Sequence, residues 1–312
     1  MIDHAKFIIN NYSNKEFELL VERLDITCPI DKDKIWFDLN KLRISYFPNT
    51  NELHIQNSLH CFYNATYGQL KEWVNYNDFN ILDLQVVSTG WSEIIFERPI
   101  EDFKLSTRFE FGLNIELDKY SPFDVIERYM SYVTTSTSPF YTCPPHKGKP
   151  SQRMCFMSDY RLKLYDKSQQ AGITKKGLLR YEVVYTELRK VRNMLSMPKF
   201  NMVTLKDLND LNNWEKLFNG MMAMYDAIKK IPLITDEFPV NDINRVYGYC
   251  NKPMADDIKR KMNPNTVDKM RAASKLIYNQ YNLSSTNYHQ VVRQKLINKY
   301  NSLTNVHQFQ GL

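Results

Sequence analysis

The chain has 312 residues, of which 43% are hydrophobic and 24% are charged, a balance typical of a soluble globular protein of one or two domains. It contains no run of about 20 apolar residues, no signal-like N-terminus and no C-x-x-C pair, so we expect no membrane span, secretion signal, disulfide framework or structural zinc site. The net charge of +6 is concentrated after residue 240, where eleven Lys and Arg stand against four Asp; this favours a nucleic-acid partner, although a solvated helical surface has the same composition.

The period of the hydrophobic pattern changes along the chain. Strand-like runs alternate with helices up to about residue 187, and the pattern is helical almost throughout from about residue 200. Apolar residues at helical spacing predict these helices: Asn14–Leu24, Gln69–Val74, Pro122–Val133 behind Ser121, Asn213–Ile231 and Thr266–Tyr281. We therefore predict an α+β domain over residues 1–200, with a mostly antiparallel sheet, and an all-helical, basic domain over residues 201–312.

Four runs of alternating residues predict strands with one polar face each, because side chains alternate between the two faces of a strand. The strands are Glu52–His60, Arg108–Leu117, Tyr160–Lys167 and Leu178–Thr186. The polar face of the first strand has His54, Gln56, Ser58 and His60, and that of the second has Arg108, Glu110, Gly112, Asn114 and Glu116. The polar face of the third has Arg161, Lys163, Tyr165 and Lys167, and that of the fourth has Arg180 and Glu182. Such a face ordinarily meets water, and a single histidine on it is more often a surface residue than a ligand.

Tyr165 stands between two lysines on one predicted strand face, Lys163 and Lys167. Cations beside a phenol stabilise the phenolate and lower a pKa that is normally about 10. They also neutralise the charge of a phosphate that is brought to the phenol. The pattern is that of a tyrosine nucleophile, although tyrosine and lysine are common on exposed strands and this chain has twenty tyrosines.

A metal site is the second chemical feature that the strands permit. If the four strands share a sheet, one face gathers Tyr165 with Glu110, Asn114, Glu182 and a histidine. Carboxylates, a carboxamide oxygen and an imidazole are suitable ligands for a divalent cation such as Mg²⁺ or Mn²⁺. A metal that polarises a phosphate oxygen beside a tyrosine is what covalent attack on a phosphodiester requires.

Three segments resemble the motifs of one protein family, in the same order. They are TRFEFGLNIE over residues 107–116, RLKLYDK over residues 161–167 and LRYEV over residues 179–183. The family is that of the rolling-circle replication initiators of the plasmid Rep_trans type and the related filamentous-phage gene II/X-like proteins, whose strands read R-x-E/D-x-G/A-x-N/D, x-Y-D/N-K and L-R-x-E. The segment NSLHCFYN over residues 57–64 is similar to the family's S-L-H-K-F/Y segment, and the resemblance covers about residues 50–210.

This resemblance implies a metal-dependent DNA endonuclease and strand transferase with a ferredoxin-like, relaxase-like catalytic domain. Tyr165 matches the catalytic tyrosine, which attacks one origin phosphate of circular DNA and leaves a 5′-phosphotyrosine link and a free 3′-hydroxyl as a primer. The other roles implied are phosphate binding by Lys163 and Lys167 and binding of Mg²⁺ or Mn²⁺ by Glu110, Asn114 and Glu182.

Two departures from the family pattern concern the metal. Asn114 stands where plasmid members often have Asp, as it does in the phage-like branch, so Glu116 is a candidate to share the ligand role. No His-hydrophobic-His pair is present in the chain, and His60 is assigned as a ligand by its position alone.

The resemblance also implies the partners. They are single-stranded or supercoiled origin DNA and the replication machinery of a bacterial host, in whose cytoplasm we expect the protein, away from membranes. Ending a rolling circle needs a second nucleophile, and either Tyr165 of the partner subunit in a homodimer or an activated water would serve. The sequence leaves both open.

The basic C-terminal region predicts a helix, a turn and a second helix, Asp268–Tyr281 and Tyr288–Tyr300, with Ser284 or Ser285 as the cap of the second. We expect one of these helices to enter a major groove of DNA. The expected DNA-binding side chains are Lys269, Arg271, Lys275, Arg293 and Lys295, together with Arg161 and Arg180 of the strands. The alternative is a packed helical pair with solvated lysines.

Two further functions fit the same sequence. One is a non-catalytic initiator or repressor that binds its origin through the C-terminal helices and dimerises through the sheet. The other is a relaxase, which has the same chemistry and different partners. A tyrosine recombinase is disfavoured, because its nucleophile lies near the end of a helical domain with an Arg-His-Arg set that this chain lacks.

Overall fold

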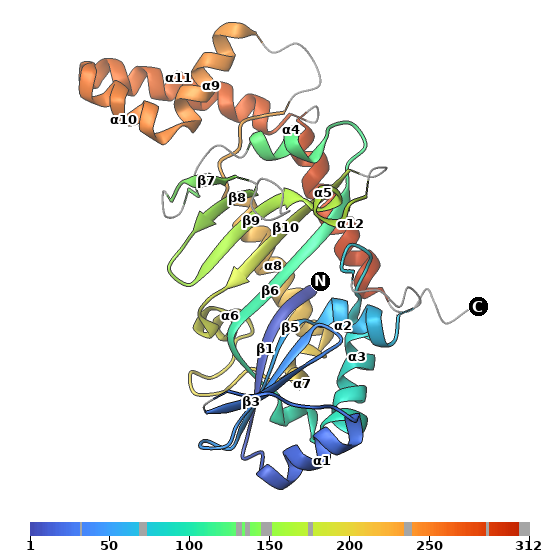
Figure 1. Ribbon diagram of the computed structural model, residues 1–312. Coiled ribbons are helices and arrows are strands. Elements are labelled where there is room, and N and C mark those ends of the chain that lie inside the picture. The colour runs from blue at the N-terminus through green and yellow to red at the C-terminus, as the bar shows by residue number, and fades with distance from the viewer. Residues whose placement is uncertain are drawn as a thin grey trace. The chain divides into compact units, whose positions relative to one another are not determined.

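The computed structural model of the protein describes residues 1–31, 33–68, 74–128, 133–134, 138–144, 152–173, 177–233, 239–284 and 287–305 (Figure 1). The strands are β1 (Ile2–Asn10), β2 (Ile30–Asp31), β3 (Lys34–Leu39), β4 (Leu42–Phe47), β5 (Glu52–Ser58), β6 (Lys104–Glu116), β7 (Phe140–Cys143), β8 (Gln152–Phe156), β9 (Tyr160–Asp166) and β10 (Leu178–Tyr185). The helices are α1 (Asn14–Leu24), α2 (Leu59–Thr66), α3 (Ile81–Thr89), α4 (Pro122–Glu127), α5 (Lys167–Ala171), α6 (Leu188–Met194), α7 (Leu205–Leu208), α8 (Leu211–Asp226), α9 (Val240–Cys250), α10 (Lys252–Lys261), α11 (Pro264–Asn282) and α12 (Tyr288–Thr304), with a π-helical turn at Gly90–Ile95 and a 3-10 turn at Ile100–Asp102. The prediction of an α+β protein with a large antiparallel sheet and a helical C-terminal region is confirmed, and the ferredoxin-like detail stays a prediction.

The chain forms two compact units, each assembled from segments that are far apart in the sequence. Unit 1 comprises Met1–Gly112, Glu182–Gly220 and Asn301–Leu312, and unit 2 comprises Leu113–Tyr181 and Met221–Tyr300. No boundary between them falls at residue 200, because the first half of α8 packs into unit 1, where the ring of Trp214 lies 6.4 Å from that of Phe111. The assignment of nicking to residues 1–200 and of DNA binding to residues 201–312 stays a prediction.

In unit 1 the strand order is β2-β3-β4-β5-β1-β6, and the pairs β1–β5, β1–β6, β3–β4 and β4–β5 are antiparallel. The core is centred on Trp91, whose ring centroid lies 5.7 to 6.0 Å from those of Phe7, Phe62, Phe96 and Phe103. Helix α1 has the predicted bounds, and the side chains of Ser13 and Glu16 form a capping box at its start.

Strand β5 is shorter than predicted. It ends at Ser58, whose hydroxyl accepts a hydrogen bond from the backbone nitrogen of Cys61 at 3.0 Å and caps α2. The expectation that His60 lies on a polar strand face is therefore wrong, because His60 is in this helix. The Ser-Leu-His segment allows the chain either to continue as a strand or to start a helix, and the serine cap stabilises the helix.

In unit 2 the strand order is β6-β10-β9-β8-β7, and β8 pairs antiparallel with both β7 and β9. One face of these strands is buried, with at most 5% exposure of Phe140, Cys155, Leu162 and Leu164. Helix α5 follows β9 directly, and its Ser168 Oγ accepts a hydrogen bond from the backbone nitrogen of Leu178 at 2.7 Å. This contact holds the start of β10 against the end of β9.

Two helices, α4 and α8, end earlier than predicted. Helix α4 begins behind Ser121 as expected but ends at Glu127, and α8 ends at Asp226. Val133 and Ile228, which we expected inside these helices, instead pair with each other in an antiparallel bridge. Residues 69–73 of the helix expected over Gln69–Val74, and the alternative cap Ser285, lie outside the described residues.

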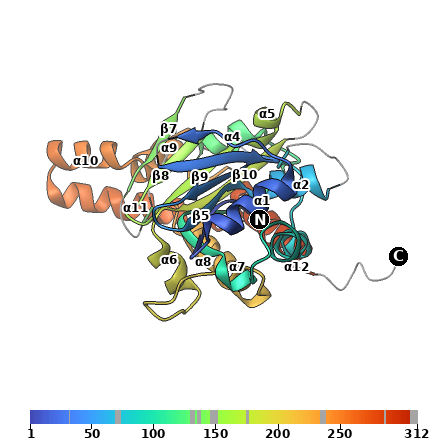
Figure 2. The same ribbon diagram turned by 60° about the horizontal axis from the view of Figure 1, so that its bottom comes forward.

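Helices α9, α10 and α11 pack against one another in unit 2 (Figure 2). Helices α11 and α12 confirm the predicted helix, turn and helix, with bounds a few residues longer than expected. No helix among the described residues combines the length and the apolar character that crossing a bilayer needs.

Candidate active site

Tyr165 lies near the end of β9, on the face of the strand opposite the core. Leu162 and Leu164 are fully buried, so the alternation of the strand turns Arg161, Lys163 and Tyr165 to the other face. Only 5% of Tyr165 is exposed, whereas Arg161 is exposed and Lys163 is half-buried. The predicted nucleophile is therefore sheltered from water at one end of a basic strand face.

Lys167 supplies a cation beside Tyr165, although it is not part of the strand as predicted. It is the first residue of α5, whose cap Asp166 accepts a hydrogen bond from the backbone nitrogen of Gln169 at 3.0 Å. The ammonium nitrogen of Lys167 lies 5.9 Å from the centroid of the Tyr165 ring and donates to Oε1 of Gln170 at 2.8 Å. Because Lys167 is only 2% exposed, little water screens its charge from the phenol.

Arg180 is a second buried cation of unit 2, on β10, the neighbour of β9 in the sheet. Its Nη1 donates to Oδ1 of Asn114 on β6 at 3.0 Å, and only 3% of Arg180 is exposed. The carboxamide oxygen that we expected as a metal ligand thus orients a guanidinium. A guanidinium held in one orientation is suited to bidentate contact with a phosphate.

Two buried carboxylates of unit 1 come from the other predicted ligand positions. Glu110 of β6 is 6% exposed and is ion-paired with Arg108, whose Nε lies 2.9 Å from Oε1 and whose Nη2 contacts the same oxygen. Glu182 of β10 is 1% exposed. Glutamates are almost never buried unless they are paired, so these positions are not the solvated polar face that strand alternation ordinarily gives.

His60 is a core residue of unit 1. It is 3% exposed, its Nε2 lies 2.8 Å from Oδ1 of Asn77, and its ring stacks on Phe79 with 5.2 Å between centroids. These contacts account for a buried histidine without a metal. Glu116, the other ligand assigned by position, is exposed at the end of β6.

The predicted metal ligands are divided between the two units, with Glu110, Glu182 and His60 in unit 1 and Asn114 in unit 2. Among the residues that the structure describes, no group of three or more His, Cys, Asp and Glu side chains is arranged to hold a metal ion. Glu110 and Asn114 instead accept hydrogen bonds from Arg108 and Arg180. The divalent metal stays a prediction from the sequence, and Lys167 is a charged neighbour of Tyr165 in the structure.

A polar cleft of about 420 Å³ opens beside the tyrosine motif in unit 2. Its lining includes Asp166, Ser168 and Gln169, which follow Tyr165 in the chain, and residues 117–122 after β6. The cleft adjoins the end of β9 through Asp166, but Tyr165 is not among its lining residues.

Sequence reasoning missed the side chains that β7 and β8 place beside this face. Gln152 lies opposite Tyr165 in the β8–β9 pair, and Phe156 lies opposite Arg161. Tyr141 of β7 is opposite Met154 of β8. The sequence signal was weak, because residues 152–156 (QRMCF) are two polar residues followed by three apolar ones and do not alternate as an amphipathic strand does.

The cations of the two C-terminal helices have different surroundings. Lys269, Arg271 and Lys275 of α11 are exposed. On α12, Arg293 makes two 2.8 Å hydrogen bonds to the carboxylate of Asp226, and Lys295 lies 3.4 Å from that of Asp118. The buried face of α12 includes Val292, Leu296 and Tyr300. Helix α12 therefore packs into the protein, and α11 presents the more accessible basic surface.

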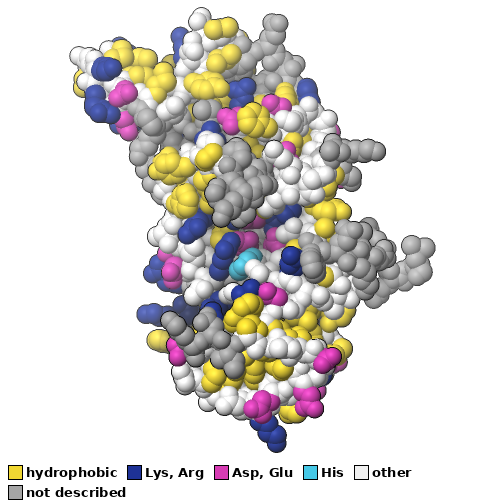
Figure 3. Space-filling view, viewed as in Figure 1, with side chains coloured by type: hydrophobic (Ala, Val, Ile, Leu, Met, Phe, Trp, Pro, Cys, Tyr) yellow, Lys and Arg dark blue, Asp and Glu magenta, His cyan; other side chains and the backbone are white. Residues whose placement is uncertain are grey.

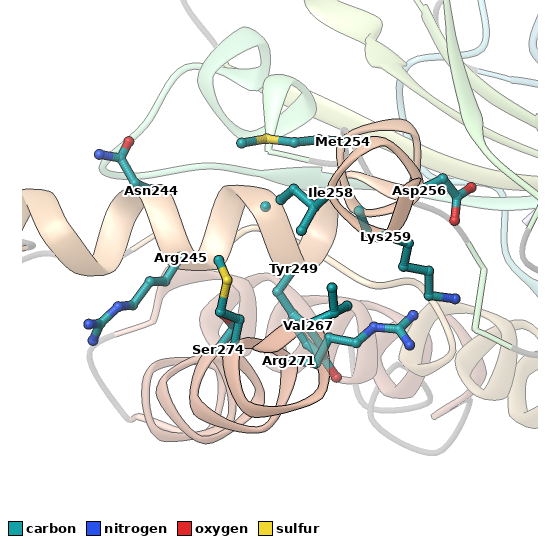
Figure 4. A pocket seen from close by; sticks show the side chains of 13 residues that line it. Asn244, Arg245, Tyr249, Met254, Asp256, Ile258, Lys259, Val267, Arg271 and Ser274 are labelled. Atoms are coloured by element: carbon teal, nitrogen blue, oxygen red, sulfur yellow. The ribbon is translucent and has the colours of Figure 1, made fainter. Parts of the chain in front are cut away.

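A cavity of about 470 Å³ lies between α9, α10 and α11 (Figure 4). Met254, Ile258 and Val267 supply apolar lining, and Arg245 and Arg271 are among its charged residues. Of the side chains predicted to bind DNA, Arg271 is the one that lines this cavity, and none of those predicted for catalysis does.

The comparisons with known proteins do not assign the chain to a family. No protein-family model matches it, and no curated protein matches it. Among solved structures, it is similar to a rolling circle replication initiator protein from Geobacillus stearothermophilus, at 10% sequence identity and a TM-score of 0.33, over 62% of this chain and 77% of that chain. A likeness of this degree does not define a shared fold, so the function is argued from the side chains of the candidate site.

Proposed function

We propose that the protein nicks and rejoins one strand of DNA through a covalent bond to Tyr165, as an initiator of rolling-circle replication. The observation that carries the proposal is the buried ammonium group of Lys167, 5.9 Å from the centroid of the sheltered Tyr165 ring. Lys163 on the same strand and Arg180 on the neighbouring strand add two further cations to this part of unit 2.

The proposed reaction is a transesterification. The phenol oxygen of Tyr165 forms a bond to phosphorus while the bond between phosphorus and the 3′-oxygen breaks, and the phenol proton ends on the departing 3′-oxygen. The products are a 5′-phosphate linked to the tyrosine and a free 3′-hydroxyl that a polymerase can extend. The reverse reaction rejoins the strand, and neither direction needs an external energy source.

The cations have separate roles in this reaction. A phenol with the ordinary pKa of about 10 costs about 4 kcal/mol to ionise at pH 7, and attraction by Lys167 stabilises the phenolate. Lys163 and Arg180 neutralise the negative charge that grows on the phosphate as the phenolate attacks.

The test uses single-stranded oligonucleotides of random sequence, labelled at the 3′ end in one sample and at the 5′ end in another. The 3′ label is expected to remain with the protein on a denaturing gel, and the 5′-labelled fragment is expected to be released and extended by a polymerase. A 5′ label that stays on the protein would reverse the proposed polarity.

The matched control is a second tyrosine of the same strand. Tyr165→Phe is expected to form no covalent complex, whereas Tyr160→Phe, on the buried face of β9, is expected to form as much as the unmodified protein. If Tyr165→Phe forms the complex at the normal rate, the assignment of the nucleophile is refuted.

A non-catalytic DNA-binding protein is the second candidate, and the exposed cations of α11 favour it. Lysines and arginines on an accessible helix are sufficient for phosphate contacts, whatever chemistry the sheet performs. This alternative predicts retention of DNA on a native gel with no covalent complex from either labelled end.

A further inference from the structure

Strands β7, β8 and β9 present aromatic and basic side chains on the face that carries Tyr165. Residues directly opposite one another in antiparallel strands share a face of the sheet. Phe156 is opposite Arg161, Met154 is opposite Lys163, and Tyr141 is opposite Met154. Phe156 and Tyr141 therefore lie on the same face as the two cations and as Tyr165.

The two aromatic side chains are open to solvent. Tyr141 is 54% exposed and Phe156 is 45% exposed, in contrast to the buried residues of the opposite face. Their ring centroids lie 6.2 Å apart, and the guanidinium carbon of Arg161 lies 5.4 Å from the centroid of Phe156. Figure 3 shows hydrophobic side chains gathered over β7 and β8, with Lys and Arg side chains beside them. Neighbouring exposed aromatics on a soluble protein indicate a surface that binds something.

We propose that Tyr141 and Phe156 form a stacking platform for the bases of single-stranded DNA, with Arg161 and Lys163 contacting the backbone phosphates. The proposal rests on the proposed nicking function for the identity of the ligand. Aromatic rings stack on any base, and cations beside them bind the phosphates of the same strand. At about 3.3 Å per residue, Arg161 lies about 13 Å along β9 from Tyr165, so a strand held on the platform extends toward the phenol.

Charge decides between DNA and a second copy of the chain as the occupant. A symmetric contact through this face would bring the basic surface of one copy, with Arg161 and Lys163, against the basic surface of the other, and like charges repel. Single-stranded DNA supplies one negative charge per nucleotide together with the flat apolar surface that the rings need.

The test measures the affinity of the full-length protein for a fluorescent oligothymidine by fluorescence anisotropy. Tyr141→Ala and Phe156→Ala are each expected to weaken binding by about 5-fold to 140-fold, the range measured for loss of one base-stacking aromatic. Phe156→Trp is expected to restore binding, which a purely structural role of Phe156 would not predict. Arg161→Gln is expected to lower the slope of log affinity against log salt by about 0.7.

The matched control is Phe200, which is 88% exposed and has the ammonium nitrogen of Lys199 5.8 Å from its ring centroid. It has the same pairing of ring and cation but belongs to unit 1. Phe200→Ala is expected to leave the affinity unchanged. The platform is refuted if Phe200→Ala weakens oligothymidine binding as much as Phe156→Ala does. It is also refuted if Phe156→Ala weakens the binding of duplex DNA as much as that of oligothymidine.

The platform and the nicking function fail in different ways. Tyr165→Phe is expected to abolish the covalent complex while the affinity for oligothymidine is kept. If Tyr141→Ala and Phe156→Ala bind oligothymidine with normal affinity, the platform is refuted, whereas the assignment of Tyr165 as the nucleophile stands. If they change the molar mass in solution and not the affinity, the face is a contact between copies of the chain, and the platform is again refuted.

Discussion

Acid is expected to destabilise the protein through one buried histidine of unit 2. His289 of α12 is 2% exposed, and its Nε2 donates a hydrogen bond to the backbone oxygen of Ile231 at 2.9 Å. Burial, followed by the charge of Lys230, lowers the pKa of His289 from 6.5 to about 3. The imidazole therefore stays neutral in the folded protein over the range in which a solvated histidine gains a proton.

The size and the sign of the effect follow from the difference between the folded and unfolded pKa values. Below pH 6.5 the unfolded chain binds a proton at residue 289 that the folded protein does not bind. The stability associated with His289 is thus fully present above pH 6.5 and is lost as the pH falls toward 3. Each pH unit in this range costs about 1.4 kcal/mol, so the loss between pH 6.5 and pH 5.0 is about 2 kcal/mol.

The measurement is urea unfolding, followed by circular dichroism, of the unmodified protein and of His289→Asn at pH 7.5 and pH 5.0. Asparagine keeps a donor near Ile231 but does not titrate. The unmodified protein is expected to lose about 2 kcal/mol more than the variant, because titrating groups that do not interact with His289 contribute equally to both and cancel. Equal losses in the two proteins would refute the argument from burial.

Three further predictions concern the candidate site and the basic helix. Nicking is expected to require Mg²⁺ or Mn²⁺, and Glu110→Ala and Glu182→Ala are expected to lose nicking while they keep their affinity for DNA. Nicking in the presence of EDTA would contradict the metal requirement. Loss of DNA affinity in the two variants would show that these acids have a structural role. Arg180→Gln is expected to slow formation of the covalent complex by about 100-fold to 1,000-fold, the usual effect of removing one donor to a developing oxyanion; an unchanged rate would remove Arg180 from the mechanism. Lys275→Ala on α11 is expected to lower the slope of log affinity for duplex DNA against log salt by about 0.9. The control is Lys206→Ala, which is expected to leave this slope unchanged because the ammonium of Lys206 pairs with Glu101 in unit 1.

Signals that act over a few residues predicted the secondary structure well. Helix α1 has the predicted bounds, because Ser13 and Glu16 cap its start within one turn and its apolar residues recur at helical spacing. The apolar face expected for β6 is buried, with Phe109 and Phe111 fully covered. Both features depend on neighbours in the sequence, which is why the sequence alone predicts them.

Features that depend on distant residues were not predictable in this way. Alternation separates the two faces of a strand but does not say whether the polar face meets water, and Glu110 and Arg180 are buried. The hydrogen bond from Arg180 to Asn114 joins residues 66 apart in the chain. The two compact units are likewise discontinuous, because β6 and β10 each contribute residues to both. A division of the chain at one residue does not describe such an arrangement.

The composition of β10 supports a functional role for its polar residues. All eight of its residues are buried, and strands buried on both faces are ordinarily continuous apolar runs. β10 nevertheless contains Arg180 and Glu182. Apolar replacements for buried charges are often neutral or stabilising, so stability alone does not account for these two residues. The proposed phosphate chemistry at the neighbouring strand β9 accounts for Arg180, because a buried and oriented guanidinium stabilises developing negative charge more strongly than a solvated one.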